Sequence, residues 1–392
     1  MGAAGSSPAL ADAGAAPSAP CAVLREHWSG FVDALTSTGH AGGPAAPAPA
    51  PRDFRQRAVW PAVPRLVAFG DLHGDLDKTR AALRAASLID HQDRWVGGTT
   101  VAVQVGDILD RGSEELRILY LLERLAGEAE RAGGRFHLMN GNHESMNVSY
   151  ASRGAQQRYA TAGAMSEFDA WLRRQRVGAS LKAVCGLPAG GCAPEGAVAE
   201  GTAPAARARA AALCQGCPVA RRFLEHRPHV LQVGSTVFAH GGLLEEHAAL
   251  GLDALNEKAS AWMRGETHSE GSSPGALPPL LSSSRAIVWS RHYSMPDASR
   301  CDCDELTRAL ARMPGAERVV VGHTIQPQSH GINAACAGAA LRVDVGMSAG
   351  CGGAPAAALE ILDDGRAGMF VLKDTPQGVT RERVPGTEPT VA

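Results

Sequence analysis

Five short loops, rich in glycine, acidic, amide and histidine residues, constrain the fold of this chain more than any other feature. Each loop follows directly on an apolar run with the length of a buried strand, and glycine lets the chain turn sharply there. The loops are Gly70–Asp75 (GDLHGD), Gly106–Gly112 (GDILDRG), Gly141–Glu144 (GNHE), His240–Gly242 (HGG) and Gly322–Thr324 (GHT). One such loop alone is typical of a structural turn, but five in order predict side chains that converge on one site.

Strands and helices are predicted to alternate from about residue 64 to residue 375, which favours an α/β fold. The first half is predicted to hold strands at Arg65–Phe69, Thr100–Val105 and Phe136–Met139, with helices at Asp77–Ser87 and Glu114–Arg131. Later strands are expected at Thr236–Ala239, Arg318–Val321, Leu341–Val345, Ala357–Leu362 and Gly368–Leu372. In such sheets the chemistry gathers on loops at the carboxyl ends of the strands.

The loops contribute oxygen and nitrogen ligands without thiolates: Asp71, His73, Asp107, Asn142, His240 and His323. This set suits Mn, Fe or Zn better than an all-oxygen Ca²⁺ or Mg²⁺ cage. Six ligands are too many for one catalytic metal with an open position, but they suit two metals that share a carboxylate. We therefore expect two divalent or transition metal ions, with Mn²⁺ as the ion in vitro and Asp107 as the bridge.

At these motifs the chain resembles the metallophosphoesterases, and among them the PPP-type phosphoprotein phosphatases. The strings VFAHGGL, VVVGHTIQ and LRVDVGMSAGC are similar to those of the Shewanella-like protein phosphatases, and the similarity covers about residues 64–375. The resemblance implies a metallophosphoesterase fold, with a central β-sandwich of two mixed sheets flanked by helices and a helical and irregular insertion. It also implies a metal-dependent phosphatase that acts on phosphoproteins.

The resemblance implies a role for each matching residue. Asp71, His73 and Asp107 would bind one metal, and Asp107, Asn142, His240 and His323 the other. His143 would protonate the leaving oxygen with Asp110 paired to it, while water activated by the two metals attacks phosphorus directly. Arg111 would hold the phosphate by charge-assisted hydrogen bonds together with Asn142, and Arg291 in the string VWSR is the candidate for a second phosphate-binding arginine.

One segment departs from the common Ser/Thr phosphatases, which carry a Ser-Ala-Pro-Asn-Tyr loop near the C-terminus. Asp344–Ser348 occupies that region here, so no tyrosine carries over and either phosphoserine/threonine or phosphotyrosine could be the substrate. A bis(5′-nucleosyl)-tetraphosphatase is the enzymatic alternative, because such enzymes share the GDxHG, GDxxDRG, GNHE and GHT pattern. A pseudophosphatase scaffold is the other alternative, although none of the expected ligands is missing.

Composition divides the chain into three parts. Residues 1–52 are rich in Ala, Pro and Gly and are predicted to form a disordered leader, apart from a short helix around Cys21–Leu35. Residues 53–375 are predicted to be the catalytic domain, with an insertion at about 150–228 that forms either a cap over the metal cleft or a surface elaboration. Residues 376–392 are expected to be a loose polar tail.

The nine cysteines leave several states open. Cys185, Cys192, Cys214 and Cys217 fall in the insertion, where a zinc site, disulfide or redox-switch pairs, and free thiols are the alternatives. Cys301 and Cys303 are too close in sequence to bridge each other comfortably. Cys336 and Cys351 could pair with each other, or with Cys301 or Cys303.

Net charge and hydropathy limit the classes of partner that this chain is expected to bind. The 38 basic and 40 acidic residues give a net charge of −2, which argues against a nucleic-acid partner, and no apolar run has the length of a transmembrane segment. The start MGAAGS fits N-myristoylation of Gly2, which by itself would give only weak membrane contact. A phosphoprotein substrate is the expected partner, and the cytoplasm the expected location, with a plastid or mitochondrion as the alternative.

Overall fold

The computed structural model describes residues 57–184, 204–267, 273 and 275–387. The chain forms two compact units, one of residues 49–173 and 193–392 and one of residues 1–48 and 174–192. The larger unit contains every predicted site residue, and the described part of the smaller unit is the second half of helix α5 (Ala162–Val184). The predicted leader with Gly2 and its short helix lies outside the described residues.

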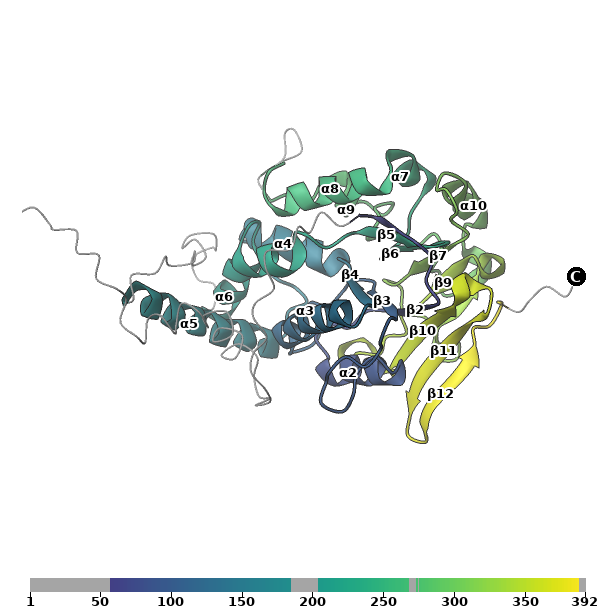
Figure 1. Ribbon diagram of the computed structural model, residues 1–392. Helices are drawn as coiled ribbons and strands as arrows, with labels where there is room; N and C mark the ends of the chain where they lie inside the picture. Colours follow the sequence, from purple (N-terminus) through teal and green to yellow (C-terminus); the bar gives the residue numbers. More distant parts are fainter. Residues whose placement is uncertain (1–56, 185–203, 268–272, 274, 388–392) are drawn as a thin grey trace, which may run out of the picture. The chain divides into compact units, whose positions relative to one another are not determined.

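Two six-stranded mixed sheets form the centre of the larger unit (Figure 1). The first sheet has the strand order β12-β11-β10-β2-β3-β4, and the second has the order β1-β5-β6-β7-β9-β8. Strands β2, β3 and β4 run parallel in the first sheet, and β6, β7 and β9 run parallel in the second. Each sheet therefore brings the carboxyl ends of three strands to one edge.

The strands are short. In the first sheet they are β2 (Arg65–Phe69), β3 (Val101–Gln104), β4 (Arg135–Leu138), β10 (Ala357–Leu362), β11 (Gly368–Thr375) and β12 (Gly378–Arg383). In the second they are β1 (Val59–Trp60), β5 (Val230–Val233), β6 (Thr236–Ala239), β7 (Arg318–Val321), β8 (Asn333–Ala335) and β9 (Ala340–Arg342). Most are apolar and buried along their length, and residues of both sheets share one hydrophobic core. This is the predicted β-sandwich of two mixed sheets.

Helices flank the sheets and frame the loops. They are α2 (Leu76–Ala85), α3 (Glu115–Arg131), α4 (Asn142–Ser152), α5, α6 (Pro204–Leu213), α7 (Glu245–Leu250), α8 (Leu252–Met263), α9 (Pro279–Ser282) and α10 (Cys303–Ala311). Helix α2 begins where the Asp75 carboxylate caps the amide of Lys78, and it buries its apolar face. Helix α4 begins at Asn142 itself, so Asn142, His143 and Glu144 of the third motif form its first turn.

The C-terminal segment corrects one expectation. Residues 378–383 were expected to lie in a loose polar tail, but they form β12, which pairs antiparallel with β11 from Phe370–Arg383 to Thr375–Gly378. The strand is exposed and polar because it is the edge strand of its sheet, and such strands lack the apolar alternation on which sequence prediction depends.

The described cysteines form two disulfides, Cys214–Cys217 and Cys303–Cys336, while Cys301 and Cys351 are free. Cys336 therefore pairs with Cys303, one of the three partners expected for it. Cys214 and Cys217 adopt the disulfide alternative, whereas Cys185 and Cys192 lie outside the described residues.

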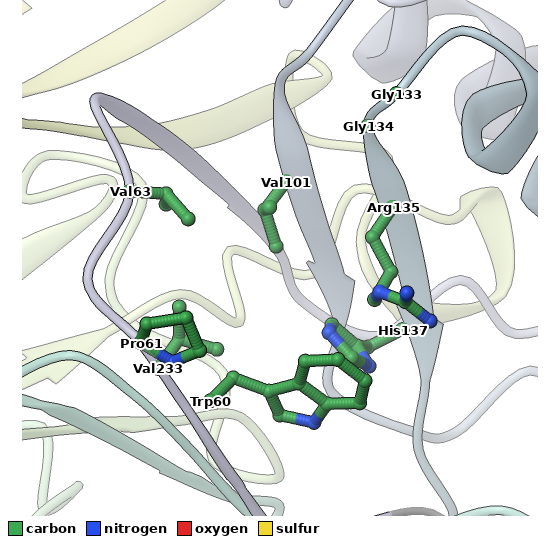
Figure 2. Close-up of a pocket in the computed structure, with 9 residues that line it drawn as sticks. All are labelled: Trp60, Pro61, Val63, Val101, Gly133, Gly134, Arg135, His137 and Val233. Atoms are coloured by element: carbon green, nitrogen blue, oxygen red, sulfur yellow. The ribbon is translucent and has the colours of Figure 1, made fainter.

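A small cavity of about 160 Å³ opens at the amino ends of β3 and β4, the end of these strands away from the five loops (Figure 2). Trp60, Val101, Arg135 and His137 line it together with Gly133, Gly134 and other apolar residues. The guanidinium of Arg135 lies 4.2 Å from the ring centre of Trp60. None of the predicted site residues takes part in this cavity. In the described part of the chain, no helix has the length and apolar character needed to cross a membrane.

Candidate metal centre and active site

Six loops meet at one place. Three of them follow the parallel strands of the first sheet, and three follow the parallel strands of the second. Loops after β2, β3 and β4 carry Asp71, Asp107 and Asn142. Loops after β6 and β7 carry His240 and His323, and the sixth loop, after β9, carries Asp344. The backbone is left-handed at five non-glycine residues of these loops, with φ of 43° at His73, 58° at Asp107, 70° at Asp110, and 65° at Arg111 and His323. Such conformations are costly and persist where the surroundings enforce them, typically at functional sites.

Close packing of two loops requires glycine. A Cβ atom on Gly141 would collide with the carboxylate of Asp107, and a Cβ on Gly322 would lie 2.6 Å from Oδ1 of Asp71. Gly141 therefore lets the third loop approach the carboxylate of Asp107, and Gly322 lets the fifth loop approach that of Asp71.

Asp107 lies at the centre of a group of ligand residues that we call the metal cluster: His73, Asp107, His240 and His323. Two groups of potential ligand atoms lie within 4.8 Å of one another, one formed by His73, Asp107 and His143 and the other by Asp107, His240 and His323. Oδ2 of Asp107 is 3.8 Å from Nε2 of His73 and 3.2 Å from Nε2 of His240. One carboxylate therefore lies between two sets of imidazoles.

Two further predicted ligands join this cluster. Oδ1 of Asn142 lies 2.9 Å from Nε2 of His240. Oδ2 of Asp71 lies 3.9 Å from Nε2 of His73, while its Oδ1 accepts a hydrogen bond from the amide of His323 at 3.3 Å. All six predicted ligands therefore converge, and five of them are almost fully buried.

Hydrogen bonds orient the imidazoles so that one nitrogen faces inward. Nδ1 of His73 lies 2.9 Å from the carbonyl of Leu109, and Nδ1 of His240 lies 3.1 Å from the carbonyl of Val105. A protonated Nδ1 that donates to a carbonyl leaves Nε2 as a metal ligand. Nε2 of His323 is buried and has no hydrogen-bond partner among the described residues, which a bound cation would explain.

Burial and neighbouring charges set the protonation of the cluster. Burial lowers the pKa of His73 to about 4 and that of His323 to about 2, so both imidazoles are neutral, as metal ligation requires. Burial opposes ionisation of Asp107, but the imidazoles of His240 and His143 hold the pKa of that carboxyl well below its usual range. Burial and the neighbouring Asp344 raise the pKa of Asp71. A divalent cation bound here would offset the repulsion between these crowded carboxyl groups.

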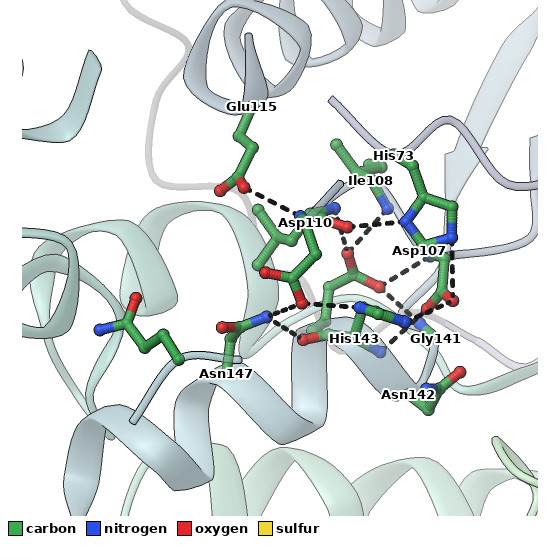
Figure 3. Close-up of polar contacts among 12 residues, drawn as sticks. His73, Asp107, Ile108, Asp110, Glu115, Gly141, Asn142, His143 and Asn147 are labelled. Atoms are coloured by element: carbon green, nitrogen blue, oxygen red, sulfur yellow. Dashed lines mark hydrogen bonds and ion pairs between the residues drawn. The ribbon is translucent and has the colours of Figure 1, made fainter. Parts of the chain in front are cut away.

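His143 and Asp110 form the predicted pair beside the cluster (Figure 3). Nδ1 of His143 lies 2.6 Å from Oδ2 of Asp110, and Nε2 of His143 lies 3.9 Å from Oδ2 of Asp107. Burial opposes protonation of His143, but Asp107 and Asp110 together raise its pKa above the ordinary value. The imidazole can therefore hold a proton on the nitrogen that faces the metal cluster.

The two predicted phosphate arginines are exposed at the edge of the site. The amide of Arg111 donates to the carbonyl of Tyr159 at 2.9 Å, and its guanidinium lies 5.3 Å from the ring centre of Tyr159. Arg291 lies close enough to the other end of the cluster for its charge to lower the pKa of His323. The charge of Arg111 contributes to the lowered pKa of His73 and that of Arg291 to the lowered pKa of His323, so the two arginines lie near different histidines of the metal cluster.

Four residues at the site were not predicted from the sequence. The buried carboxylate of Glu144 accepts hydrogen bonds from four amides of two loops, those of Asp107, Ile108, Leu109 and Gly141, at 2.7–3.1 Å. Asp344 follows β9, and burial raises its pKa to about 6. Tyr159 lies 5.3 Å from His143 between ring centres, and Arg209 of the insertion contacts Asp110.

Only the first two residues had a signal in the sequence. Glu144 is the last residue of GNHE, and Asp344 follows an apolar strand as the loop aspartates do. Tyr159 and Arg209 lie in the irregular insertion, where no motif marks them.

Comparison with known proteins agrees with this geometry. The calcineurin-like phosphoesterase family matches residues 64–196. Shewanella-like protein phosphatase 2 of Arabidopsis thaliana is 40% identical over 371 residues, which cover 92% of this chain and 90% of that protein. The chain belongs to the Shewanella-like protein phosphatases. It is accordingly a metal-dependent phosphatase, as the resemblance of its motifs predicted.

Two more distant proteins are similar to the chain in part of the sequence or in the fold. Shewanella-like protein phosphatase 1 of Plasmodium berghei is 26% identical over 290 residues, 72% of this chain and 67% of that protein. The solved cold-active protein-tyrosine phosphatase of a psychrophilic Shewanella species has a TM-score of 0.60 at 20% identity, covering 89% of this chain and 90% of that one. This likeness confirms the predicted metallophosphoesterase sandwich.

Proposed function

We propose that this Shewanella-like protein phosphatase hydrolyses phosphomonoesters on Ser/Thr or Tyr side chains of proteins, by direct attack of water with His143 as the general acid. The observation that carries the proposal is the sharing of Asp107 between two groups of ligand atoms, next to a histidine that is held by a second carboxylate. No phosphoenzyme is required, because water activated by the two metal ions would be the nucleophile.

The metal ligands fit a pair of divalent ions. Asp71, His73 and Asp107 would hold one ion, and Asp107, Asn142, His240 and His323 the other. Neutral, oriented imidazoles and the unpartnered Nε2 of His323 support this assignment. When bound, two such ions activate water as a nucleophile and offset the charge of a phosphate. Mn²⁺ is the ion proposed for assays, and Fe or Zn are also compatible with this ligand set.

The chain's own residues complete the reaction. As the new bond from water oxygen to phosphorus forms, the bond from phosphorus to the leaving oxygen breaks and its electron pair stays on that oxygen. His143 gives the proton on Nε2 to this oxygen, and Asp110 stabilises the imidazole that donates it. Arg111, Arg291 and the amide of Asn142 would bind the equatorial phosphate oxygens through charge-assisted and neutral hydrogen bonds.

The leaving-group side of the site favours an aromatic substrate. Tyr159 is 42% exposed, and its ring lies next to both Arg111 and His143, the residues proposed to bind the phosphate and to protonate the leaving oxygen. An aromatic ring at that position can stack on phosphotyrosine, whereas phosphoserine has no ring to offer. Phosphotyrosine is therefore the proposed preference within the phosphoprotein class.

An activity panel tests the proposal. Protein depleted of metal with a chelator and reloaded with Mn²⁺ would be assayed on a phosphotyrosine peptide, a phosphoserine/threonine peptide pair and diadenosine tetraphosphate. We expect activity on the phosphopeptides, highest on phosphotyrosine, and loss of activity in the depleted protein. Activity confined to diadenosine tetraphosphate would replace the proposal with the nucleotide alternative. Metal binding without turnover of any substrate would indicate a scaffold.

A further inference from the structure

Arg209, on helix α6 of the insertion, is a fully buried cation that contacts Asp110. Asp110 and His143 together are called the acid pair. Its side chain has no exposed surface, and the helix around it is alanine-rich, without a catalytic motif. Burying a guanidinium is costly unless hydrogen bonds and opposite charges compensate for the lost water. The contacts of this arginine therefore show what it is built to hold.

Every N–H of the guanidinium has an acceptor. Nε donates to Glu115 Oε2 at 3.0 Å, and Nη1 donates to Oδ1 of Asn147 and Oε1 of Gln157, both at 2.6 Å. Nη2 donates to Oδ1 of Asp110 at 3.0 Å and to Oε2 of Glu115 at 2.8 Å. Five donors are all that an arginine possesses, so this set, which we call the arginine cluster, is complete.

The arginine cluster fixes Asp110 from three directions. Oδ1 receives Arg209, while Oδ2 receives the side-chain amide of Asn147 at 2.7 Å and faces Nδ1 of His143 at 2.6 Å. Asp110 has a left-handed backbone conformation, and its backbone amide donates to Oε1 of Glu115 at 2.9 Å. With Oδ1 held on one side, Oδ2 is aimed at the histidine.

We propose that Arg209 is a positioning residue for the leaving-group proton transfer: through Asp110 it fixes the direction in which His143 presents Nε2. The insertion thereby completes the acid pair instead of only covering the site. The inference rests on the proposed role of His143 as the acid. Misplacement of a catalytic group by a fraction of an ångström to one ångström costs up to about a hundredfold in rate, so a side chain that fixes its orientation has a measurable effect.

The experiment measures how the rate depends on the leaving group. Mn²⁺-loaded full-length protein would be assayed on phenyl, 4-nitrophenyl and 2,4-dinitrophenyl phosphate, whose leaving oxygens need a proton progressively less. For Arg209→Met we expect kcat on phenyl phosphate to fall about ten- to a hundredfold, with less than about a threefold loss on 2,4-dinitrophenyl phosphate. KM and the amount of bound Mn²⁺ should stay unchanged, because the metal cluster is intact.

Arg207 is the matched control, since it lies on the same helix and is exposed. Arg207→Met should leave all three rates at the wild-type level. Arg209→Lys keeps the charge but lacks the planar five-donor fork, and it should steepen the same dependence even where the methionine variant fails to fold.

Two outcomes would overturn the inference. An equal loss on all three substrates in Arg209→Met and Arg209→Lys would show a purely structural role, and wild-type rates would show no role. His143→Asn separates this inference from the proposed function. If His143→Asn leaves the leaving-group dependence unchanged, the acid assignment is wrong; if it alone steepens the dependence, only the role of Arg209 is wrong.

Discussion

The metal cluster and the arginine cluster lie side by side around two aspartates of one loop, and they are built in opposite ways. Around Asp107, three imidazole Nε2 atoms lie 3.2–3.9 Å away, and one buried ring nitrogen has no partner among the described residues. Around Asp110, every donor of the buried arginine is hydrogen-bonded to a protein acceptor. The first arrangement suits a cation from solution, whereas the second is complete within the chain and holds side chains still.

The loop that carries Asp107 and Asp110 therefore serves both metal binding and proton transfer. Ligands of an exchangeable ion need inward-facing lone pairs, which backbone carbonyls provide here by fixing the outward nitrogens of His73 and His240. A general acid needs one fixed direction for its proton, which requires a carboxylate that cannot rotate. Substitutions should therefore act on metal binding in one cluster and on proton transfer in the other.

The largest expected effect is that of Asp107→Asn. Removing the shared carboxylate should lower kcat/KM on a phosphotyrosine peptide by at least about a thousandfold, because both groups of ligands lose their common charge. Metal content measured by elemental analysis should fall with activity, while the circular dichroism spectrum stays that of the wild type. Asp77→Asn is the control, because Asp77 is 94% exposed. Retained turnover would disprove the bridging role.

Glu144→Gln should act on the scaffold that the two clusters share. A neutral amide cannot accept from all four backbone amides that bind the buried carboxylate, so we expect the free energy of unfolding to fall by about 3 kcal/mol in urea denaturation. Glu257→Gln, at a side chain that is 64% exposed, should change it by less than about 0.5 kcal/mol. Equal stability of the two variants would show that the loops do not depend on this carboxylate.

A smaller effect is expected at Tyr159, on the edge shared by both clusters. Tyr159→Leu should reduce kcat/KM on a phosphotyrosine peptide about three- to tenfold and leave a phosphoserine peptide unchanged, because only the aromatic substrate loses a stacking partner. Tyr159→Phe keeps the ring and should behave as the wild type. A uniform loss on both peptides would assign Tyr159 to phosphate binding through Arg111 instead.

The smallest effect concerns pH and the surroundings of the arginine cluster. Burial, with Glu115 nearby, raises the pKa of Glu167 from an ordinary 4.5 to about 7. Between these values the folded state binds more protons than the unfolded state, so stability falls as pH rises through this window. Glu167→Gln should reduce the fall measured between pH 5 and pH 7.5 by about 1 kcal/mol. An unchanged slope would show that Glu167 is not the group responsible.

The metal cluster could be predicted because the sequence signal for each of its residues is local. Each ligand stands directly after an apolar strand, and Arg65–Phe69, Thr236–Ala239, Arg318–Val321 and Ala357–Leu362 are strands with the bounds that their composition predicts. The predicted strand Leu341–Val345 ends instead at Arg342, since Asp344 and Gly346 already belong to the sixth loop.

The arginine cluster could not be predicted because its contacts are long-range. Arg209 reaches Asp110 from 99 residues away and Asn147 from 62 residues away, and an arginine in an alanine-rich helix is usually on the surface. Edge strand β12 and the Cys303–Cys336 pairing were likewise undetermined, because register and pairing depend on tertiary packing.

The central claim is that Asp107 joins two ligand groups into one dinuclear site. The most direct test is an anomalous difference map at the manganese edge from crystals of the Mn²⁺-loaded protein. We predict two peaks about 3.5–4 Å apart on either side of the Asp107 carboxylate, one near Asp71 and His73 and one near His240 and His323. A single peak, or peaks away from Asp107, would contradict the account.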